Sequence, residues 1–238
     1  WPEMRRLKAD LVDEHFYRPY EWFLKEGARY DNYDRKGPKV FAGEYASHVT
    51  GKDGEPTVAK NNWEAALSEA AFMTGLERNA DVVWQCTYAP LFAHVDGWQW
   101  RPDLIWFDNL KSVRSVNWYV QMLYGTYKGT NVLQLTENGK PVEGEDGLYA
   151  SAVYDKPTKK FIVKIANASD QPKQVVLNFK GAKNLATAQV ISLHADDKQA
   201  TNSLEQPNNV VPKESELQAN GSNLTLTIPA QTFQVVRL

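Results

Sequence analysis

The amino-acid sequence predicts a parallel α/β region followed by an all-β region. Three observations support this prediction: three short apolar runs end in polar residues, helical patterns separate and follow those runs, and the chain changes to short alternating runs after Gly129. Alternation of strands and helices indicates parallel strands joined by crossovers, whereas many short strands separated by turns indicate a β-sandwich.

The first predicted strand spans residues 10–17, Asp-Leu-Val-Asp-Glu-His-Phe-Tyr. Successive side chains of a strand point to opposite faces, so Asp13, His15 and Tyr17 share one face. Glu14 stands in the opposite phase. We therefore expect its charge to face helices or solvent and assign it no chemistry.

The second predicted strand spans residues 39–46, Lys-Val-Phe-Ala-Gly-Glu-Tyr-Ala. Alternation puts Glu44 on the same face as Val40 and Ala42, opposite Tyr45. A carboxylate at the carboxyl end of an apolar strand is where parallel-barrel enzymes place their chemistry. The alternative is an acid that only points into water.

The third predicted strand lies within the run 81–92. Pro90 cannot donate to a β-ladder, so the strand should stop near Tyr88. Cys86 lies in this strand and is the single cysteine, which excludes an internal disulfide. We expect a buried, unreactive thiol there.

Three helical patterns accompany these strands. Apolar or small residues recur at helical spacing on one face of residues 61–74, and Asn61 or Asn62 can cap that helix. A second apolar stripe runs through residues 112–127, and a shorter helix is predicted over residues 19–26.

Three strand–helix units occupy residues 1–128. A three-stranded parallel sheet would leave both edges and much apolar surface uncovered, whereas eight units close a barrel. We therefore predict that residues 1–128 form the last three units of a (β/α)8 TIM barrel whose earlier strands are absent from this chain. A small open α/β domain is the alternative.

A β-sandwich is predicted over residues 129–238, because short alternating runs are separated there by turn signals. The runs are Val132–Leu135, Leu148–Tyr154, Phe161–Ile165, Gln174–Phe179, Ala188–Leu193, Leu224–Ile228 and Phe233–Leu238. The polar segment 195–221 is expected to be a long surface loop with a structural role.

Charge and composition exclude several classes of function. A net charge of −2 gives no reason to expect nucleic acid or an anionic membrane as partner. No apolar stretch approaches the roughly 20 residues that a membrane span needs. The four histidines, at positions 15, 48, 94 and 194, lack metal-ligand spacing.

Aromatic side chains crowd the segment after the third strand, where barrel loops line an active site. Indole faces pack against the C–H faces of sugars, and nearby polar groups bond hydroxyls. We therefore select Trp98, Trp100, Arg101 and Asp103 as candidate sugar contacts, with loop packing as the alternative for the two tryptophans. The aromatic pair at 106–107 is expected in the core.

Five motifs together resemble one family. They are Asp13-Glu-His-Phe-Tyr17, Val40-Phe-Ala-Gly-Glu-Tyr-Ala46, Tyr88-Ala-Pro-Leu-Phe92, Trp100-Arg-Pro-Asp-Leu-Ile-Trp-Phe-Asp108 and Asn202-Ser-Leu-Glu-Gln-Pro-Asn-Asn-Val-Val-Pro212. In combination they resemble the α-L-arabinofuranosidases of glycoside hydrolase family 51, over nearly the whole chain. The resemblance implies a (β/α)8 barrel followed by a jelly-roll-like β-sandwich. It also implies release of terminal α-L-arabinofuranosyl groups from arabinose-containing oligo- or polysaccharides with net retention, without a metal or organic cofactor.

By this resemblance Glu44 is the nucleophile, and His15 and Tyr17 support the site. We expect Tyr17 to hydrogen-bond the Glu44 carboxylate. Retention requires two carboxyl groups about 5–5.5 Å apart. The family's acid/base is the Glu of an Asn-Glu pair, and no predicted strand here contains that pair. We therefore expect the acid/base to lie upstream, in the missing N-terminal half of the barrel, and this chain alone to be inactive.

Two other interpretations remain open. The chain could be a non-catalytic glycan-binding or assembly piece, or part of a related endoglucanase. The resemblance further implies a secreted or periplasmic protein and, by analogy, a homo-oligomer.

Overall fold

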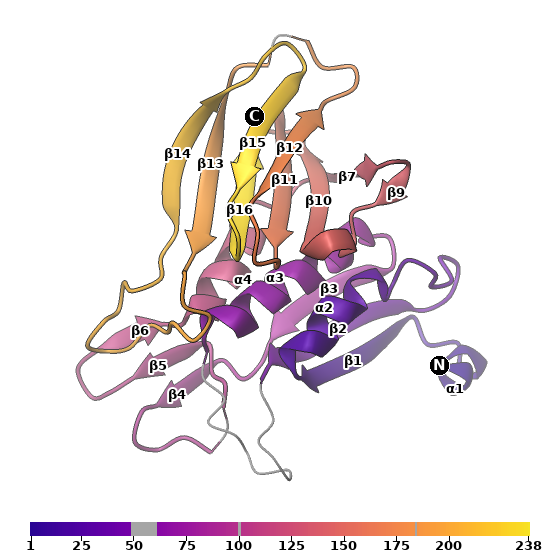
Figure 1. The fold of residues 1–238 in the computed structure, drawn as a ribbon. Coiled ribbons are helices and arrows are strands. Elements are labelled where there is room, and N and C mark those ends of the chain that lie inside the picture. The colour runs from indigo at the N-terminus through magenta and orange to yellow at the C-terminus, as the bar shows by residue number, and fades with distance from the viewer. Residues whose placement is uncertain (49–60, 100, 184) are drawn as a thin grey trace.

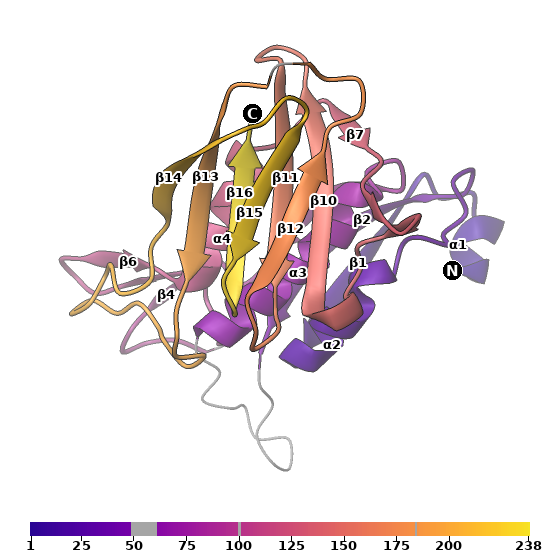
Figure 2. The ribbon, with the colours of Figure 1, turned by 45° about the horizontal axis from the view of Figure 1, so that its top comes forward.

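The computed structural model describes residues 1–48, 61–99, 101–183 and 185–238. Figure 1 shows a small parallel sheet with its helices and, above it, a taller set of antiparallel strands. Helix α3 (Trp63–Arg78) lies between these two regions in both Figure 1 and Figure 2.

The parallel sheet has the predicted strand order. Lys39 pairs with Leu11 at one end, and Tyr88 pairs with Tyr45 at the other. The third strand ends at Tyr88, as predicted from Pro90. The elements of this region, besides α3, are α1 (Pro2–Arg6), β1 (Leu11–Arg18), α2 (Tyr20–Lys25), η1 (Glu26–Ala28), β2 (Lys39–Ser47) and β3 (Val83–Tyr88).

Strand β3 forms an open edge of the sheet in the part of the chain that the structure describes. Trp84 is 63% exposed there. Cys86 is also exposed, so the prediction of a buried thiol was wrong. The physical reason is the position of β3, because an edge strand has a neighbour on one side only.

Helix α3 is buried nearly all round, so the prediction of a one-faced helix was wrong. Only Glu64, Glu77 and Arg78 among its residues are not buried. The parallel sheet covers one side of α3, and β10 (Leu148–Asp155) and β11 (Lys160–Asn167) cover another. A helix that packs between two sheets has no face exposed to solvent. The small residues in the sequence of α3 are the sign of this packing.

Three strands of three residues each follow β3 and form a separate small sheet. They are β4 (Phe92–His94), β5 (Ile105–Phe107) and β6 (Ser112–Arg114). The sequence did not predict them, because runs this short show no clear alternation. Trp106 and Phe107 lie in β5 and are half-buried, so the prediction that they belong to the core was wrong. Helix α4 (Val116–Thr126) then begins after its cap, Ser115.

The antiparallel region contains strands at all seven predicted runs. A six-stranded sheet of order β14–β13–β16–β11–β10–β7 and a two-stranded sheet β12–β15 enclose a shared apolar core. Besides β10 and β11, the elements are β7 (Asn131–Leu133), β8 (Thr136–Glu137), β9 (Lys140–Pro141), η3 (Glu145–Gly147), β12 (Lys173–Asn178), β13 (Thr187–His194), β14 (Lys213–Gln218), β15 (Asn223–Ile228) and β16 (Thr232–Arg237).

Strand β14 corrects the prediction that 195–221 is entirely loop. Its residues pair with β13 at the edge of the sheet and are mostly exposed. An edge strand with two exposed faces needs no apolar alternation, so the pattern gave no signal.

The loop before β14 packs against the start of α3. The backbone N–H of Trp63 donates to the carbonyl of Ala200, and that of Glu64 donates to the carbonyl of Lys198, both at 2.9 Å. The first amides of a helix lack partners within the helix. The loop supplies those partners, which agrees with the structural role predicted for it.

Candidate functional site

The carboxyl ends of β1 and β2 bring three of the predicted site residues together. The Tyr17 hydroxyl donates to Glu44 Oε2 at 2.6 Å, and His15 Nδ1 lies 3.5 Å from the same oxygen. The predicted contact between Tyr17 and Glu44 is therefore present in the structure.

A β-bulge in β2 turns Glu44 toward these partners. The register with β1 shifts between the pairs Asp13–Phe41 and His15–Glu44. Strict alternation had placed Glu44 on the face of Val40 and Ala42, and that prediction was wrong. The extra residue in β2 reverses the alternation, because a bulge opposes two residues to one and re-aims the side chains that follow.

Side chains from both neighbouring strands hold the bulge at Gly43. The Gly43 N–H donates to Asp13 Oδ1 at 3.1 Å, and Thr87 Oγ1 donates to the Gly43 carbonyl at 2.5 Å. A Cβ atom at this position would meet Asp13 Oδ1 at 2.3 Å. Only glycine therefore permits this close approach.

The same Asp13 carboxylate also orients the histidine. Its Oδ2 atom lies 3.0 Å from His15 Nε2, while His15 Nδ1 faces Glu44. One imidazole thus bridges two carboxylates, and Gly43, Asp13, His15 and Glu44 form one connected network.

Electrostatics keep the Tyr17 phenol as a hydrogen-bond donor. Burial, followed by the hydrogen bond and the negative charge of Glu44, raises the pKa of Tyr17 well above its usual value. The Glu44 side chain is 44% exposed, so it remains open on one side. A partly exposed carboxylate held by a neutral phenol is oriented and still accessible to a ligand.

Glu14 lies on the other side of β1, facing the helices. Its carboxylate accepts from Trp1 Nε1 at 2.8 Å, Tyr30 OH at 2.8 Å and Tyr33 OH at 3.1 Å, and Arg29 Nε lies 3.6 Å away. These contacts agree with one of the two orientations expected from the sequence, and they satisfy the charge within the fold.

The aromatic segment after β3 folds around one cation. The Arg101 guanidinium lies 3.9 Å from the ring centre of Trp98 and 5.3 Å from that of Trp106. Trp98 is 39% exposed. Trp100, the second predicted sugar platform, lies outside the described residues.

Asp103 is buried, which was not expected for a sugar contact. Burial raises the pKa of its carboxyl to about 6, and the nearby Arg101 charge opposes that shift. With 3% of its surface exposed, it offers little area to a ligand.

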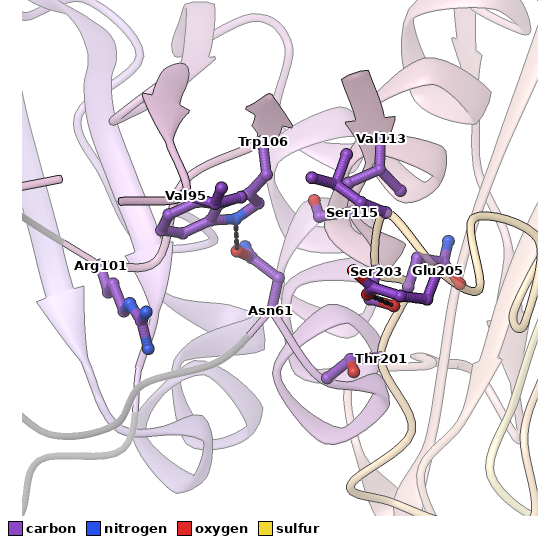
Figure 3. Close-up of a pocket in the computed structure, with 11 residues that line it drawn as sticks. Asn61, Val95, Arg101, Trp106, Val113, Ser115, Thr201, Ser203 and Glu205 are labelled. Carbon is purple, nitrogen blue, oxygen red and sulfur yellow. Dashed lines mark hydrogen bonds between the residues drawn. The ribbon is translucent and has the colours of Figure 1, made fainter. Parts of the chain in front are cut away.

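A pocket of about 310 Å³ opens between this aromatic segment and the loop before β14 (Figure 3). The residues that line it are Asn61, Val95, Arg101, Trp106, Val113, Ser115, Thr201, Asn202, Ser203, Leu204 and Glu205. The polar residues 201–203 and Glu205 were not selected from the sequence, because a polar loop far along the chain gives no sign of what it faces.

Asn61 joins this pocket to the parallel sheet. Its Oδ1 accepts from Trp106 Nε1 at 3.1 Å, and its Nδ2 donates to the Tyr88 hydroxyl at 3.0 Å. Asn62, not Asn61, caps α3, by accepting from the Ala65 N–H at 2.9 Å. The two candidate caps thus separate into one structural and one pocket residue.

The described residues contain no group of side chains arranged to hold a metal ion. Among the same residues, no helix is both long and apolar enough to cross a lipid bilayer.

The fold and the strand-end site define a class of protein: a three-stranded parallel α/β region with polar side chains at its strand ends, followed by a β-sandwich. Comparison with known proteins specifies the family. The model of the α-L-arabinofuranosidase C-terminal domain matches residues 43–231. The chain belongs to this family, that of the α-L-arabinofuranosidase C-terminal domain.

Individual relatives agree with this assignment. An extracellular exo-α-L-arabinofuranosidase of Streptomyces chartreusis is 51% identical over 133 residues, which cover 56% of this chain and 15% of that protein. α-L-Arabinofuranosidase 1 of Arabidopsis thaliana is 31% identical over 231 residues, covering 94% of this chain and 33% of the relative. The chain thus spans about a third or less of the length of these two proteins.

Solved structures share the fold. The arabinose-bound α-L-arabinofuranosidase MgGH51 matches with a TM-score of 0.86 and 32% identity, over 96% of this chain and 36% of that one. The Thermotoga maritima α-L-arabinofuranosidase in complex with arabinose matches with a TM-score of 0.74 at 15% identity, over 96% and 52%. The second likeness concerns the fold alone.

Proposed function

We propose that this chain carries the nucleophile of a retaining α-L-arabinofuranosidase. The observation that supports this most directly is the Glu44 carboxylate, re-aimed by a bulge and bonded by Tyr17 at 2.6 Å. Family membership supports the substrate class that we propose, a terminal α-L-arabinofuranosyl group on an oligo- or polysaccharide.

In this proposal Glu44 attacks the anomeric carbon and forms a glycosyl–enzyme intermediate, which water then hydrolyses. Tyr17 keeps the attacking oxygen oriented, and His15, held by Asp13, fixes the other side of the carboxylate. A second carboxyl protonates the leaving oxygen and later deprotonates the water. We assign that group to an upstream part of the barrel, since the relatives are about three times longer than this chain.

The test is replacement of Glu44 in a protein that carries the complete barrel. Glu44→Ala should abolish hydrolysis of a nitrophenyl arabinofuranoside, and added azide should restore turnover by forming a glycosyl azide of inverted configuration. Glu216→Gln, a change of an exposed glutamate in β14, is the matched control. Near-normal activity of Glu44→Ala would refute the assignment.

A second candidate is glycan binding without catalysis. It is favoured by the Trp98–Arg101 stack beside the 310 Å³ pocket. Binding of an arabinan oligosaccharide to this chain alone, lost in Trp98→Ala but retained in Glu44→Ala, would support it. Hydrolysis of a β-glucan in place of arabinofuranosides would instead favour the related endoglucanase.

Further parts of the proposal concern organisation and context. Residues 1–128 would belong to the catalytic barrel and 129–238 to the sandwich. We also propose secretion or periplasmic export, supported by the extracellular relative from Streptomyces chartreusis, and a homo-oligomeric assembly by analogy.

A further inference from the structure

Among the described residues, no strand pairs with the carboxyl end of β2 on one of its edges. His48 N donates to the Arg18 carbonyl of β1 at 3.0 Å, so the preceding amide, that of Ser47, points to the opposite edge. Strand β3 ends at Tyr88 and cannot pair there. The Ser47 N–H donates to Glu69 Oε1 of α3 at 2.7 Å. A helix side chain thus replaces the missing ladder acceptor.

Glu69 is fully buried, which needs a physical explanation. Burying a carboxyl is costly unless its oxygens are hydrogen-bonded, and an apolar residue would fill the same space at lower cost. The bond to Ser47 is the contact that an apolar residue could not make. The neighbouring Ser68 Oγ also donates to Ser47 Oγ, at 2.9 Å. The two side chains fix the end of β2 against α3.

Helix α4 completes this attachment from a second side. Gln121 Oε1 accepts from the Tyr45 hydroxyl at 2.8 Å. Among the described residues, no hydrogen bond joins Glu69 Oε2 to the side-chain amides of Asn117 and Gln121, so α4 attaches to β2 through Tyr45. Tyr45 directly follows Glu44. The segment 44–47 is therefore held by α3 and α4 on one side, while Gly43 is held by Asp13 and Thr87 from the strands.

We propose that Glu69 is a positioning residue, which holds the end of β2 so that the Glu44 carboxylate stays aligned with Tyr17. The inference rests on the proposed role of Glu44 as nucleophile. Ser47 is three residues from Glu44, so release of its amide would free the strand directly after the bulge. Small misplacements of an attacking group lower rates strongly.

The charge state of Glu69 gives this role a dependence on pH. Burial raises the pKa of Glu69 to about 8, opposed by the Asn117 amide, the Ser47 N–H and the Gln121 amide. The titratable groups that face it are Tyr45 from β2 and Tyr88 from β3, whose pKa values burial raises well above 10. Helix α4 presents only neutral amides to it among the described residues.

Protonation of Glu69 therefore favours the folded site. The raised pKa means that its contribution to stability is complete below the ordinary value of 4.5 and is lost as pH rises through about 8. Above that pH, Glu69 becomes a buried negative charge behind β2, and the described residues offer it no cationic partner. We expect the alignment of Glu44, and with it turnover, to decline on this alkaline limb.

Two substitutions in a protein with the complete barrel distinguish the role of Glu69 as a hydrogen-bond acceptor from the effect of its charge. Glu69→Leu removes the acceptor, so kcat should fall by about tenfold or more with KM within about threefold, and the Ser47 amide should exchange hydrogen faster. Glu69→Gln keeps an acceptor oxygen and cannot ionise. Its kcat should stay near the unmodified value at pH 7, and the alkaline limb near pH 8 should move upward. Glu216→Gln is the control for both measurements.

The outcomes are distinguishable. A folded Glu69→Leu variant with unchanged kcat and unchanged Ser47 exchange would overturn the proposal. Should that variant fail to fold, an alkaline limb of Glu69→Gln identical to that of the unmodified protein would overturn it. If the unmodified protein hydrolyses no arabinofuranoside, the proposed function fails, and Ser47 exchange in Glu69→Gln and Glu69→Leu still decides whether Glu69 holds the end of β2.

Discussion

The carboxyl end of the parallel sheet and the β-sandwich are held together by different means. In the sandwich, β10 pairs with β11 over eight residues and β11 with β16 over six, through continuous backbone ladders. At the end of β2, the backbone groups of Gly43 and Ser47 bond to side chains of Asp13, Thr87 and Glu69. Single side chains therefore determine the geometry of the site, whereas the sandwich depends on many equivalent bonds.

This difference has a physical basis. A continuous ladder allows little freedom in where a side chain points, because alternation is fixed by the backbone. A bulge breaks alternation and leaves backbone groups unpaired, so polar side chains must satisfy them. The parallel sheet uses this irregularity to direct Glu44 toward Tyr17 and His15.

The largest effect is expected where the two regions meet. Lys164 of β11 is fully buried and forms an ion pair with Glu77 of α3, and its Nζ also donates to the Tyr127 carbonyl at 2.8 Å. Lys164→Ala leaves Glu77 without its cation, so the free energy of unfolding should fall by about 3–5 kcal/mol. Chemical denaturation of this chain measures it.

The matched comparison is the double substitution Lys164→Met with Glu77→Leu. Replacing both charges by apolar groups of similar size removes the desolvation cost together with the attraction. The double variant should be close to the unmodified chain in stability. Equal destabilisation in the single and double variants would contradict a role for the unpaired charge.

The next effect concerns the bulge itself. In Gly43→Ala the new Cβ would meet Asp13 Oδ1 at 2.3 Å, so the carboxylate must move away from both Gly43 N and His15. Turnover in a protein with the complete barrel should fall by about 100-fold, because Glu44 loses its alignment. Stability should fall by only about 1 kcal/mol or less, because the exposed Asp13 carboxylate can rotate away from the new Cβ.

Gly125→Ala is the control for that change. Gly125 lies in α4, and a Cβ atom there meets nothing within 4 Å. This alanine should stabilise the chain by about 0.5–1 kcal/mol and leave turnover unchanged. If both alanine variants behaved alike, the bulge would not be the reason for glycine at position 43.

A smaller effect is expected for the phenol. Tyr17→Phe removes the donor to Glu44 and leaves the ring in place, so kcat should fall by about 10- to 100-fold with little change in unfolding temperature. Tyr154→Phe, in the sandwich beside Phe161, is the matched control. Steady-state kinetics and thermal unfolding on both variants check this. Unchanged kinetics in Tyr17→Phe would remove the phenol from the mechanism.

The same difference between the regions explains what the sequence could predict. The strands at 10–17, 39–46 and the seven sandwich runs were predictable, because regular ladders leave a regular pattern. The face of Glu44 was not, because it depends on Asp13 binding Gly43 across 30 positions of sequence. The role of Glu69 was also not predictable from the sequence, because its neighbours in α3 are small residues whose pattern is that of an ordinary helix.

The smallest effect should come from the sandwich edge. Ser215 of β14 pairs with Val190 of β13 through the backbone, and its side chain is exposed. Ser215→Ala leaves every ladder bond in place, so the free energy of unfolding should change by less than about 0.5 kcal/mol. Denaturation of this variant tests whether backbone pairing alone holds the edge. A loss of about 2 kcal/mol or more would show that side chains hold the sandwich as they hold the end of β2.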